Sequence, residues 1–255
     1  MGNKYYTNEE GESIEGSSIG CFETEKIYGD IIEELNKLKK QFNLILTDPP
    51  YNIGWKYSSK VNDRKKNYDE WCEDWVNLCI DKLQDNGVLG IINYPENNNI
   101  LYNYMIKRKD INFIQQIIWC YSTNVGHSKS KYTRSYRTIL LFSKGKNYTF
   151  NALKQPYKNP NDKRIKERIA QGHLGTNLYD VWNINLCKNV SKDKKNNGIN
   201  QLPKELCEKL IKTFSNPYDN ILDPFAGNFT IPEIATDLNR CGHGIDINNY
   251  DLTNN

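Results

Sequence analysis

The 255-residue chain lacks the features that define several common classes of protein. No apolar run approaches the roughly 20 residues that a membrane helix needs, and the acidic, polar amino terminus has no signal-peptide pattern. The seven cysteines include no C-x-x-C pair, and the three histidines are isolated from one another. We therefore expect a cytoplasmic protein with no membrane segment, no metal site and no disulfide framework.

Acidic residues are scarce in one long segment. Residues 122–195 hold 16 Lys and Arg but only 4 Asp and Glu, a balance of +12, whereas the rest of the chain holds 18 basic and 27 acidic residues. Tyrosines and a tryptophan are interleaved with these basic residues, which favours nucleic-acid binding over the alternative of a solvated lysine-rich loop. Four basic residues are the predicted phosphate contacts: Lys129, Lys131, Arg134 and Arg137.

The spacing of apolar residues predicts alternating helices and strands, which is typical of one large α/β domain. Helices are expected over residues 30–40, 68–83, 97–109, 162–171, 202–214 and 231–238, with Asp85-Asn86-Gly87 ending the second of them. Strands are expected over 42–47, 88–93, 111–121 and 138–142, and immediately before Asp223 and Asp246.

The motif Asp48-Pro49-Pro50-Tyr51 directly follows the predicted buried strand 42–47. Two prolines there force a stiff, extended turn, and ligands of open α/β sheets bind beyond the carboxyl ends of strands. Asp48 and a backbone carbonyl could accept the two N–H bonds of an exocyclic amino group, while Tyr51 stacks on the base that carries it. A strand-ending turn with a half-buried tyrosine is the structural alternative.

A second motif lies near the end of the chain, where residues 221–230 read as a short strand, a glycine turn and the start of a helix. Gly227 lets the backbone approach a ligand closely. Asp246 ends the next predicted strand, where an acidic residue is placed to bind ribose hydroxyls. Only one glycine is present, so the pattern is not G-x-G-x-x-G, and a tight turn is the alternative.

Together the two motifs resemble those of the amino-group DNA methyltransferases, which use S-adenosylmethionine to methylate adenine N6 or cytosine N4. The catalytic motif of that family is matched by Asp48, Pro49, Pro50 and Tyr51. Its cofactor motif is matched from Asp223 to Gly227, with Phe229 at the position of the usual second glycine. The catalytic motif comes first along the chain, as in the permuted β subgroup.

The resemblance implies a Rossmann-like S-adenosylmethionine-dependent methyltransferase fold, circularly permuted, with a mixed, mostly parallel sheet and helices on both faces. It also implies a set of cofactor-binding residues: Asp30, Gln201, Pro203, Asp223, Pro224, Phe225, Ala226, Gly227, Asn228 and Asp246. Gly198 and Ile199 replace the His and Pro that usually precede Gln201.

The expected organisation is a flexible tail over residues 1–20 and one methyltransferase domain over 21–255. Its catalytic half spans about 26–146, a target-recognition insert about 147–198, and its cofactor half about 199–250. We expect a duplex DNA substrate methylated at adenine N6 by base flipping, with cytosine N4 as the alternative. An RNA methyltransferase, a non-catalytic nucleic-acid-binding module, a homodimer and a partnering restriction endonuclease stay open.

Overall fold

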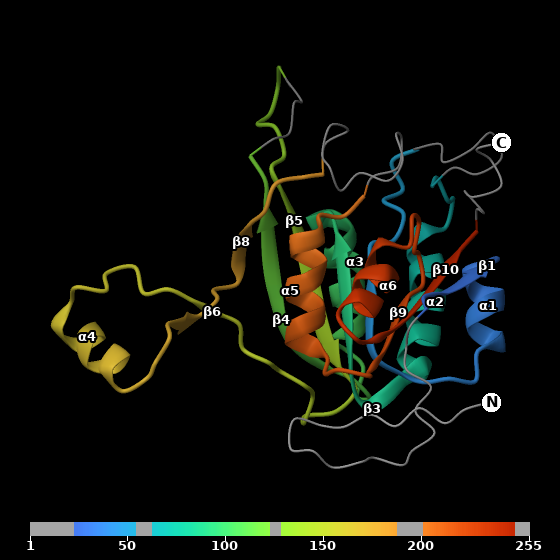
Figure 1. Cartoon of the computed structure of the whole chain (residues 1–255). Helices are drawn as coiled ribbons and strands as arrows, with labels where there is room; N and C mark the ends of the chain where they lie inside the picture. The colour runs from blue at the N-terminus through green and yellow to red at the C-terminus, as the bar shows by residue number, and fades with distance from the viewer. Residues whose placement is uncertain (1–22, 55–62, 123–128, 188–200, 248–255) are drawn as a thin grey trace, which may run out of the picture.

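A computed structural model describes residues 23–54, 63–122, 129–187 and 201–247. Its centre is an eight-stranded sheet in the order β1-β10-β9-β2-β3-β5-β4-β8 (Figure 1). The strands are β1 Glu25–Tyr28, β2 Phe42–Thr47, β3 Leu83–Asn93, β4 Asn112–Cys120, β5 Tyr136–Ser143, β8 Val181–Asn183, β9 Asn220–Asp223 and β10 Cys241–Asp246. The α/β fold with a mostly parallel sheet that the sequence predicts is confirmed.

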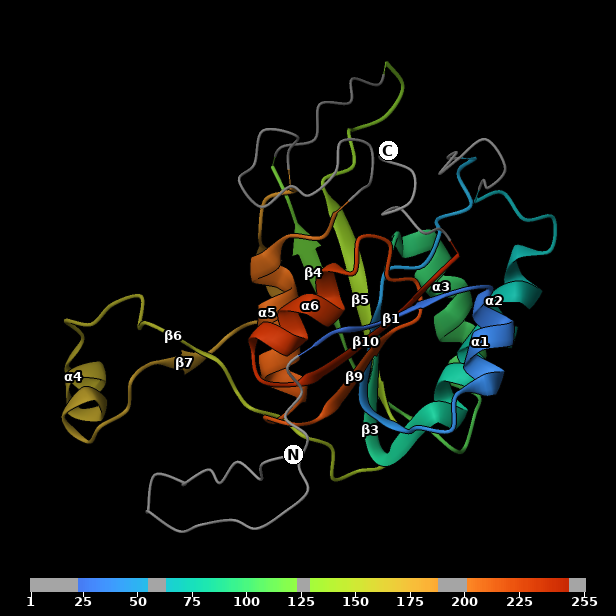
Figure 2. The same ribbon diagram turned by 45° about the vertical axis from the view of Figure 1, so that its right-hand side comes forward.

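The last two strands of the chain lie between its first two. Strand β10 pairs with β1, and β9 pairs with β2, in both cases parallel. The segment that the sequence assigns to the cofactor is thereby placed beside the strand that precedes Asp48 (Figure 2). The two motifs therefore lie on adjacent strands although the catalytic motif comes first along the chain.

Strand direction decides which residues share the functional edge of the sheet. Strands β1, β10, β9, β2 and β3 are mutually parallel, so their carboxyl ends meet at one edge. Strand β5 is antiparallel to both β3 and β4. Its amino end, not its carboxyl end, therefore lies at the same edge as Asp48.

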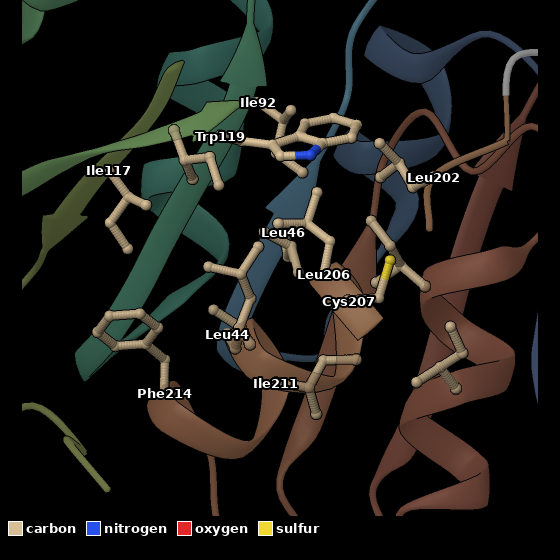
Figure 3. Packing of buried hydrophobic residues seen from close by; sticks show 14 of the residues in the cluster. Leu44, Leu46, Ile92, Ile117, Trp119, Leu202, Leu206, Cys207, Ile211 and Phe214 are labelled. Carbon is tan, nitrogen blue, oxygen red and sulfur yellow. The ribbon is translucent and has the colours of Figure 1, made fainter. Parts of the chain in front are cut away.

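Helices cover both faces of the sheet. The helices α1 Ile31–Lys37, α2 Tyr68–Lys82 and α3 Pro95–Met105 pack on one face, and α5 Lys204–Phe214 and α6 Thr230–Asp237 pack on the other. Alternation along β2 explains this division, because Leu44 and Leu46 join the α5 and α6 cluster while Ile45 joins the α1, α2 and α3 cluster. Figure 3 shows the first of these cores, where Leu206 and Ile211 of α5 lie close to Leu44 and Leu46.

The chain segment that connects β5 to β8 forms an arm that extends from the side of the sheet. It contains β6 Lys154–Gln155, α4 Lys163–Ala170 and β7 Thr176–Asn177, with β6 and β7 paired antiparallel. Both ribbon views show α4 far from the rest of the fold (Figures 1 and 2). No residue of α4 is buried, and Asp162 caps its amino end through bonds to the Arg164 and Ile165 amides.

Two expectations from the sequence are wrong, and strand β1 was not predicted. Helix α2 ends at Lys82 and β3 begins at once, so Asp85-Asn86-Gly87 forms an irregular part of β3 where the partner of β2 shifts from Leu83 to Val88, and not the end of the helix. Cys241 is disulfide-bonded, although the cysteine spacing gave no sign of a bridge.

Candidate active site

Asp48 stands at the carboxyl end of β2 with a side chain that is 13% exposed. Its Oδ1 accepts a short hydrogen bond from the Tyr51 hydroxyl. Its Oδ2 lies 3.5 Å from Nη1 of Arg137, at the amino end of β5. Burial raises the pKa of Asp48, whereas the Arg137 cation and the Tyr51 hydrogen bond lower it.

The two proline carbonyls of the motif have different surroundings. The Pro50 carbonyl accepts a 2.6 Å bond from the Tyr68 hydroxyl at the start of α2. Within the described residues no hydrogen bond to the Pro49 carbonyl is seen. Beside Asp48, the Pro49 carbonyl is therefore available to accept a hydrogen bond from a ligand.

Tyr51 is less open than the sequence implied. Its side chain is 8% exposed, and its ring lies 4.7 Å from that of Tyr94 and 4.8 Å from the Arg137 guanidinium. Its carbonyl also accepts a bond from Asn97 of α3. Stacking of Tyr51 on a target base stays a prediction, and the structure adds Tyr94 and Arg137 as neighbours that no motif indicated.

Asp223, the first residue of the cofactor motif, lies next to the catalytic strand. Its Oδ1 accepts bonds from the Thr47 hydroxyl (2.9 Å) and from the Phe225 amide (3.0 Å). Burial raises the pKa of Asp223 to about 8, with the nearby carboxylates of Asp48 and Asp246 adding to the shift. Both donors converge on Oδ1, and burial favours the neutral form of this carboxyl group.

The turn after β9 is fixed by the end of β10. The Gly227 amide donates to Oδ2 of Asp246 at 2.9 Å, and the Ala226 amide donates to the Ile245 carbonyl at 2.8 Å. Gly227 has a φ of 52°, a conformation that glycine adopts without strain. The Gly29 amide bonds the Asp246 carbonyl, which brings the turn after β1 to the same edge.

Asp30 follows directly and caps α1 by accepting from the Ile32 amide. Asp30 thus follows the turn whose Gly29 amide bonds the Asp246 carbonyl. Carboxylates at the ends of adjacent strands, next to a tight glycine turn, suit the hydroxyl and ammonium donors of S-adenosylmethionine. The residues present therefore fit this cofactor.

Phe229 adopts the backbone geometry that the missing glycine would supply. Its φ of 56° and ψ of 28° are left-handed, which costs a non-glycine residue about 1–2 kcal/mol. The ring is 3% exposed and packs edge-on against Tyr28 at 5.5 Å. A side chain at Gly244 would collide with the Phe229 ring at 2.6 Å. Phe229 therefore keeps the left-handed backbone that glycine adopts easily, and its buried ring adds packing that a glycine could not provide.

The structure corrects the role of one predicted phosphate contact. Arg137 is 4% exposed and faces Asp48, because β5 carries it into the edge of the sheet. It is also within 5.5 Å of the rings of Tyr94 and Trp119. A phosphate backbone cannot reach this guanidinium from solvent. Knowing that β5 runs antiparallel to β3 and β4 would have identified Arg137 as a neighbour of Asp48.

The other predicted contacts lie at the surface or at a helix start. Lys129 and Lys131 are exposed, and Arg134 pairs with Glu96 while covering the ring of Tyr94 at 4.4 Å. Pro203 is the residue that precedes α5, and Gln201 is buried just before it. Asn228 and Pro224 belong to the turn after β9. Residues 1–20 and the start of the basic segment, 123–128, lie outside the described residues.

Neither a metal cluster nor a membrane span is found where the structure describes the chain. In residues 23–54, 63–122, 129–187 and 201–247 no three His, Cys, Asp or Glu side chains gather in a way that could hold a metal ion. The helices in those ranges are too short or too polar to cross a membrane.

The sheet order, the carboxylates at its edge and the glycine turn are those expected of an S-adenosylmethionine-dependent methyltransferase. Solved structures share this fold. The chain superimposes on the cytosine-N4-specific PvuII DNA methyltransferase with a TM-score of 0.67 and 16% identity, covering 90% of this chain and 84% of that one. For the M1.HpyAVI complex with S-adenosylmethionine the TM-score is 0.58 at 17% identity, covering 89% and 94%.

Sequence relatives specify the family. The DNA methylase profile for N6 and N4 methylation matches residues 42–253, so the chain belongs to that family. It is 32% identical to the type II methyltransferase M.HpaI of Haemophilus parainfluenzae (87% of this chain, 69% of the relative). It is 30% identical to the DNA adenine methyltransferase YhdJ of Escherichia coli K12 (87% and 78%). The protein is an S-adenosylmethionine-dependent enzyme that methylates amino groups of DNA, as its motifs predict.

Proposed function

We propose that this enzyme methylates adenine N6 in duplex DNA at one short sequence. Methylation of an amino group is supported by the pair of acceptors at the end of β2, the Asp48 carboxylate and the Pro49 carbonyl, which the Thr47 to Asp223 bond ties to the turn after β9. A leading Asp in this motif is commoner among adenine-directed relatives, and the relative YhdJ is named as an adenine methyltransferase.

The chemistry follows from how an amino group conjugated to a ring behaves. Its lone pair is delocalised, so it is a poor nucleophile until its two N–H bonds are held and the lone pair is directed at the methyl donor. Asp48 and Pro49 accept those two bonds. S-adenosylmethionine supplies a methyl group on a positively charged sulfur, which retains the electron pair of the broken C–S bond. As the N–C bond forms, the amino nitrogen becomes positive, and the Asp48 carboxylate stabilises that charge until the nitrogen releases one proton to solvent water.

Access to the amino group requires base flipping, because the duplex buries it. The basic segment Lys129 to Arg134 lies close to the catalytic edge, and the α4 arm of the insert 147–198 carries four basic residues on one exposed helix. We propose that both contact the DNA and that the insert reads the target sequence. The name of M.HpaI as a type II methyltransferase also favours a cognate restriction endonuclease as a functional partner.

Cytosine N4 is the second candidate, favoured by the likeness in fold to the PvuII enzyme. Adenine and cytosine offer the same two N–H donors, so Asp48 could serve either. Mass spectrometry of nucleosides from duplex DNA methylated in vitro distinguishes them, and N6-methyladenine is the expected product. Methylated cytosine without methylated adenine would overturn the assignment of the base. Methylation of neither, despite bound cofactor, would favour an RNA substrate.

A further inference from the structure

Arg137 is a buried cation beside the carboxylate that the proposed reaction depends on. Its guanidinium is 3.5 Å from Oδ2 of Asp48, the one carboxylate within ion-pair distance of it in the described ranges. Three rings surround it, with centroids at 4.8 Å for Tyr51, 5.5 Å for Tyr94 and 5.2 Å for Trp119. A guanidinium that is 4% exposed loses most of its hydration, so this cage and Asp48 must supply what water does not.

The topology of the sheet, and no local motif, brings the two residues together. Arg137 is opposite Trp119 of β4 in the sheet register, and its neighbour Thr138 is opposite Asn93 at the end of β3. Because β5 runs against the other strands, its first residues reach the edge where β2 delivers Asp48. The pair therefore joins residues that are 89 positions apart in the chain.

A nearby cation favours the ionised form of a carboxylate in this position. Burial favours its neutral form, and a protonated Asp48 would present an O–H where the amino group also presents N–H. An ionised carboxylate has about four acceptor positions. Tyr51 uses one on Oδ1 and Arg137 faces Oδ2, so acceptor positions remain for the substrate.

We propose that Arg137 is a positioning residue for methyl transfer, whose buried guanidinium holds the Asp48 carboxylate ionised and turned to accept an N–H bond of the target amino group. This inference rests on the proposed function, because it concerns the same carboxylate. It adds a residue that neither motif of the chain contains. In this proposal, the first residues of β5 support the reaction and do not contact phosphate.

Other titratable groups around the pair determine how the test is designed. They are Tyr51, Tyr94, Tyr121, Cys207 of α5 and Asp223 of β9. Burial raises the pKa of Tyr51, Tyr121 and the Cys207 thiol above their usual values, so these three groups stay neutral across the working range. Asp223, with a pKa of about 8, titrates within that range, so the measurements are repeated in an Asp223→Asn background.

The experiment is the pH dependence of single-turnover methyl transfer at saturating duplex DNA and radiolabelled S-adenosylmethionine. In Arg137→Met the acid limb should move to higher pH by about one to three units, the range expected when an adjacent opposite charge is removed. Arg137→Lys keeps the charge, so its acid limb should stay near that of the wild type even if its rate is lower. Arg108→Met is the matched control: Arg108 also lies over a tyrosine ring, that of Tyr104, but pairs with Asp110 and not with Asp48, so the acid limb should not move.

A uniform loss of rate at every pH in Arg137→Met would indicate a purely structural role and overturn the proposal, as would an equal shift in Arg137→Lys. Arg137→Gln repeats the comparison if the Met variant fails to fold, as judged by thermal unfolding and cofactor binding. Total label in DNA is counted, so transfer to either adenine or cytosine registers. Absence of transfer by the wild type would count against the proposed function, whereas normal transfer with an unmoved acid limb would count against Arg137 alone.

Discussion

The hydroxyl of Thr47 donates a 2.9 Å hydrogen bond to the carboxyl of Asp223, 176 residues further along the chain. Both side chains are buried, at 0% and 3% exposure. The bond joins the last residue of the catalytic strand to the first residue of the cofactor motif. The distance between the turn after β2, which holds Asp48 and Pro49, and the turn after β9 is thus fixed by a contact inside the protein.

This arrangement predicts that the two carboxylates at the edge have separable roles. Asp48→Ala should lower methyl transfer by about 10²–10³-fold or more and leave cofactor binding nearly intact. Asp246→Ala should weaken cofactor binding through lost charged hydrogen bonds, worth about 1.5–3 kcal/mol each. Calorimetric titration with S-adenosylmethionine and a DNA methylation assay measure both variants. An equal loss of cofactor affinity in the two would contradict the division.

Asp223 should make the stability of the protein depend on pH. Its folded pKa of about 8 lies above the unfolded value near 3.8, so the folded state holds the proton more tightly between these values. Stability should therefore fall as pH rises through this window, by up to about 1.4 kcal/mol per pH unit. Urea unfolding at pH 5.5 to 8.5 measures this. Asp223→Asn keeps an acceptor for Thr47 and should make the free energy of unfolding less dependent on pH. If the variant and the wild type differed in this free energy by the same amount at every pH, the raised pKa of Asp223 would be refuted.

Phe229 should respond to substitution in an unusual order. Phe229→Ala loses a buried ring at a cost of about 3–5 kcal/mol but keeps the strained left-handed backbone. Phe229→Gly loses the same ring and relieves that strain, so it should be the more stable of the two by about 1 kcal/mol. Ile234, buried inside α6, provides the control: there Gly should be less stable than Ala by about the same amount. Thermal or urea unfolding of the four variants decides the matter.

The basic segment should contribute to DNA affinity through exposed charge alone. Lys129→Ala or Lys131→Ala should weaken binding to all duplex sequences similarly and make the slope of log affinity against log salt shallower by about one unit. Lys37 is the control, since α1 begins at the catalytic edge and carries Lys37 away from it. Fluorescence anisotropy at several salt concentrations measures the slopes. Unchanged slopes in both variants would favour a solvated loop.

Much of the fold was predictable because its signals are local. Strand β2 follows from one apolar run, and α2, α5 and α6 follow from their apolar spacing, so the structure reproduces these elements to within a few residues. Strand β1 was not predicted, since four residues of mixed polarity form a strand only because β10 pairs with them. Gly87 reads as a helix stop, yet a side chain there would lie 2.9 Å from the Phe42 carbonyl, so the irregular start of β3 requires it.

The residues of the site also fall into those with a local sequence signal and those placed by distant parts of the chain. Asp48, Gly227 and Asp246 belong to motifs that the sequence displays, and the structure brings them to one edge. The phosphate role expected of Arg137 was wrong because its position depends on the direction of β5 and on pairing with β4, neither of which composition reveals. The hydroxyl of Tyr68, which engages the Pro50 carbonyl, is likewise known only once α2 is packed.

The placement of β9 and β10 between β1 and β2 also has a consequence for synthesis on the ribosome. Strand β1 emerges first, yet its partner is β10, which is translated more than 200 residues later. Strand β2 likewise has one side unpaired until β9 appears. Pairings this distant in sequence are slow to form and leave strand edges exposed in the meantime. The centre of the sheet is thus completed last, and the nascent enzyme stays dependent on protection from aggregation until residue 246 has been made.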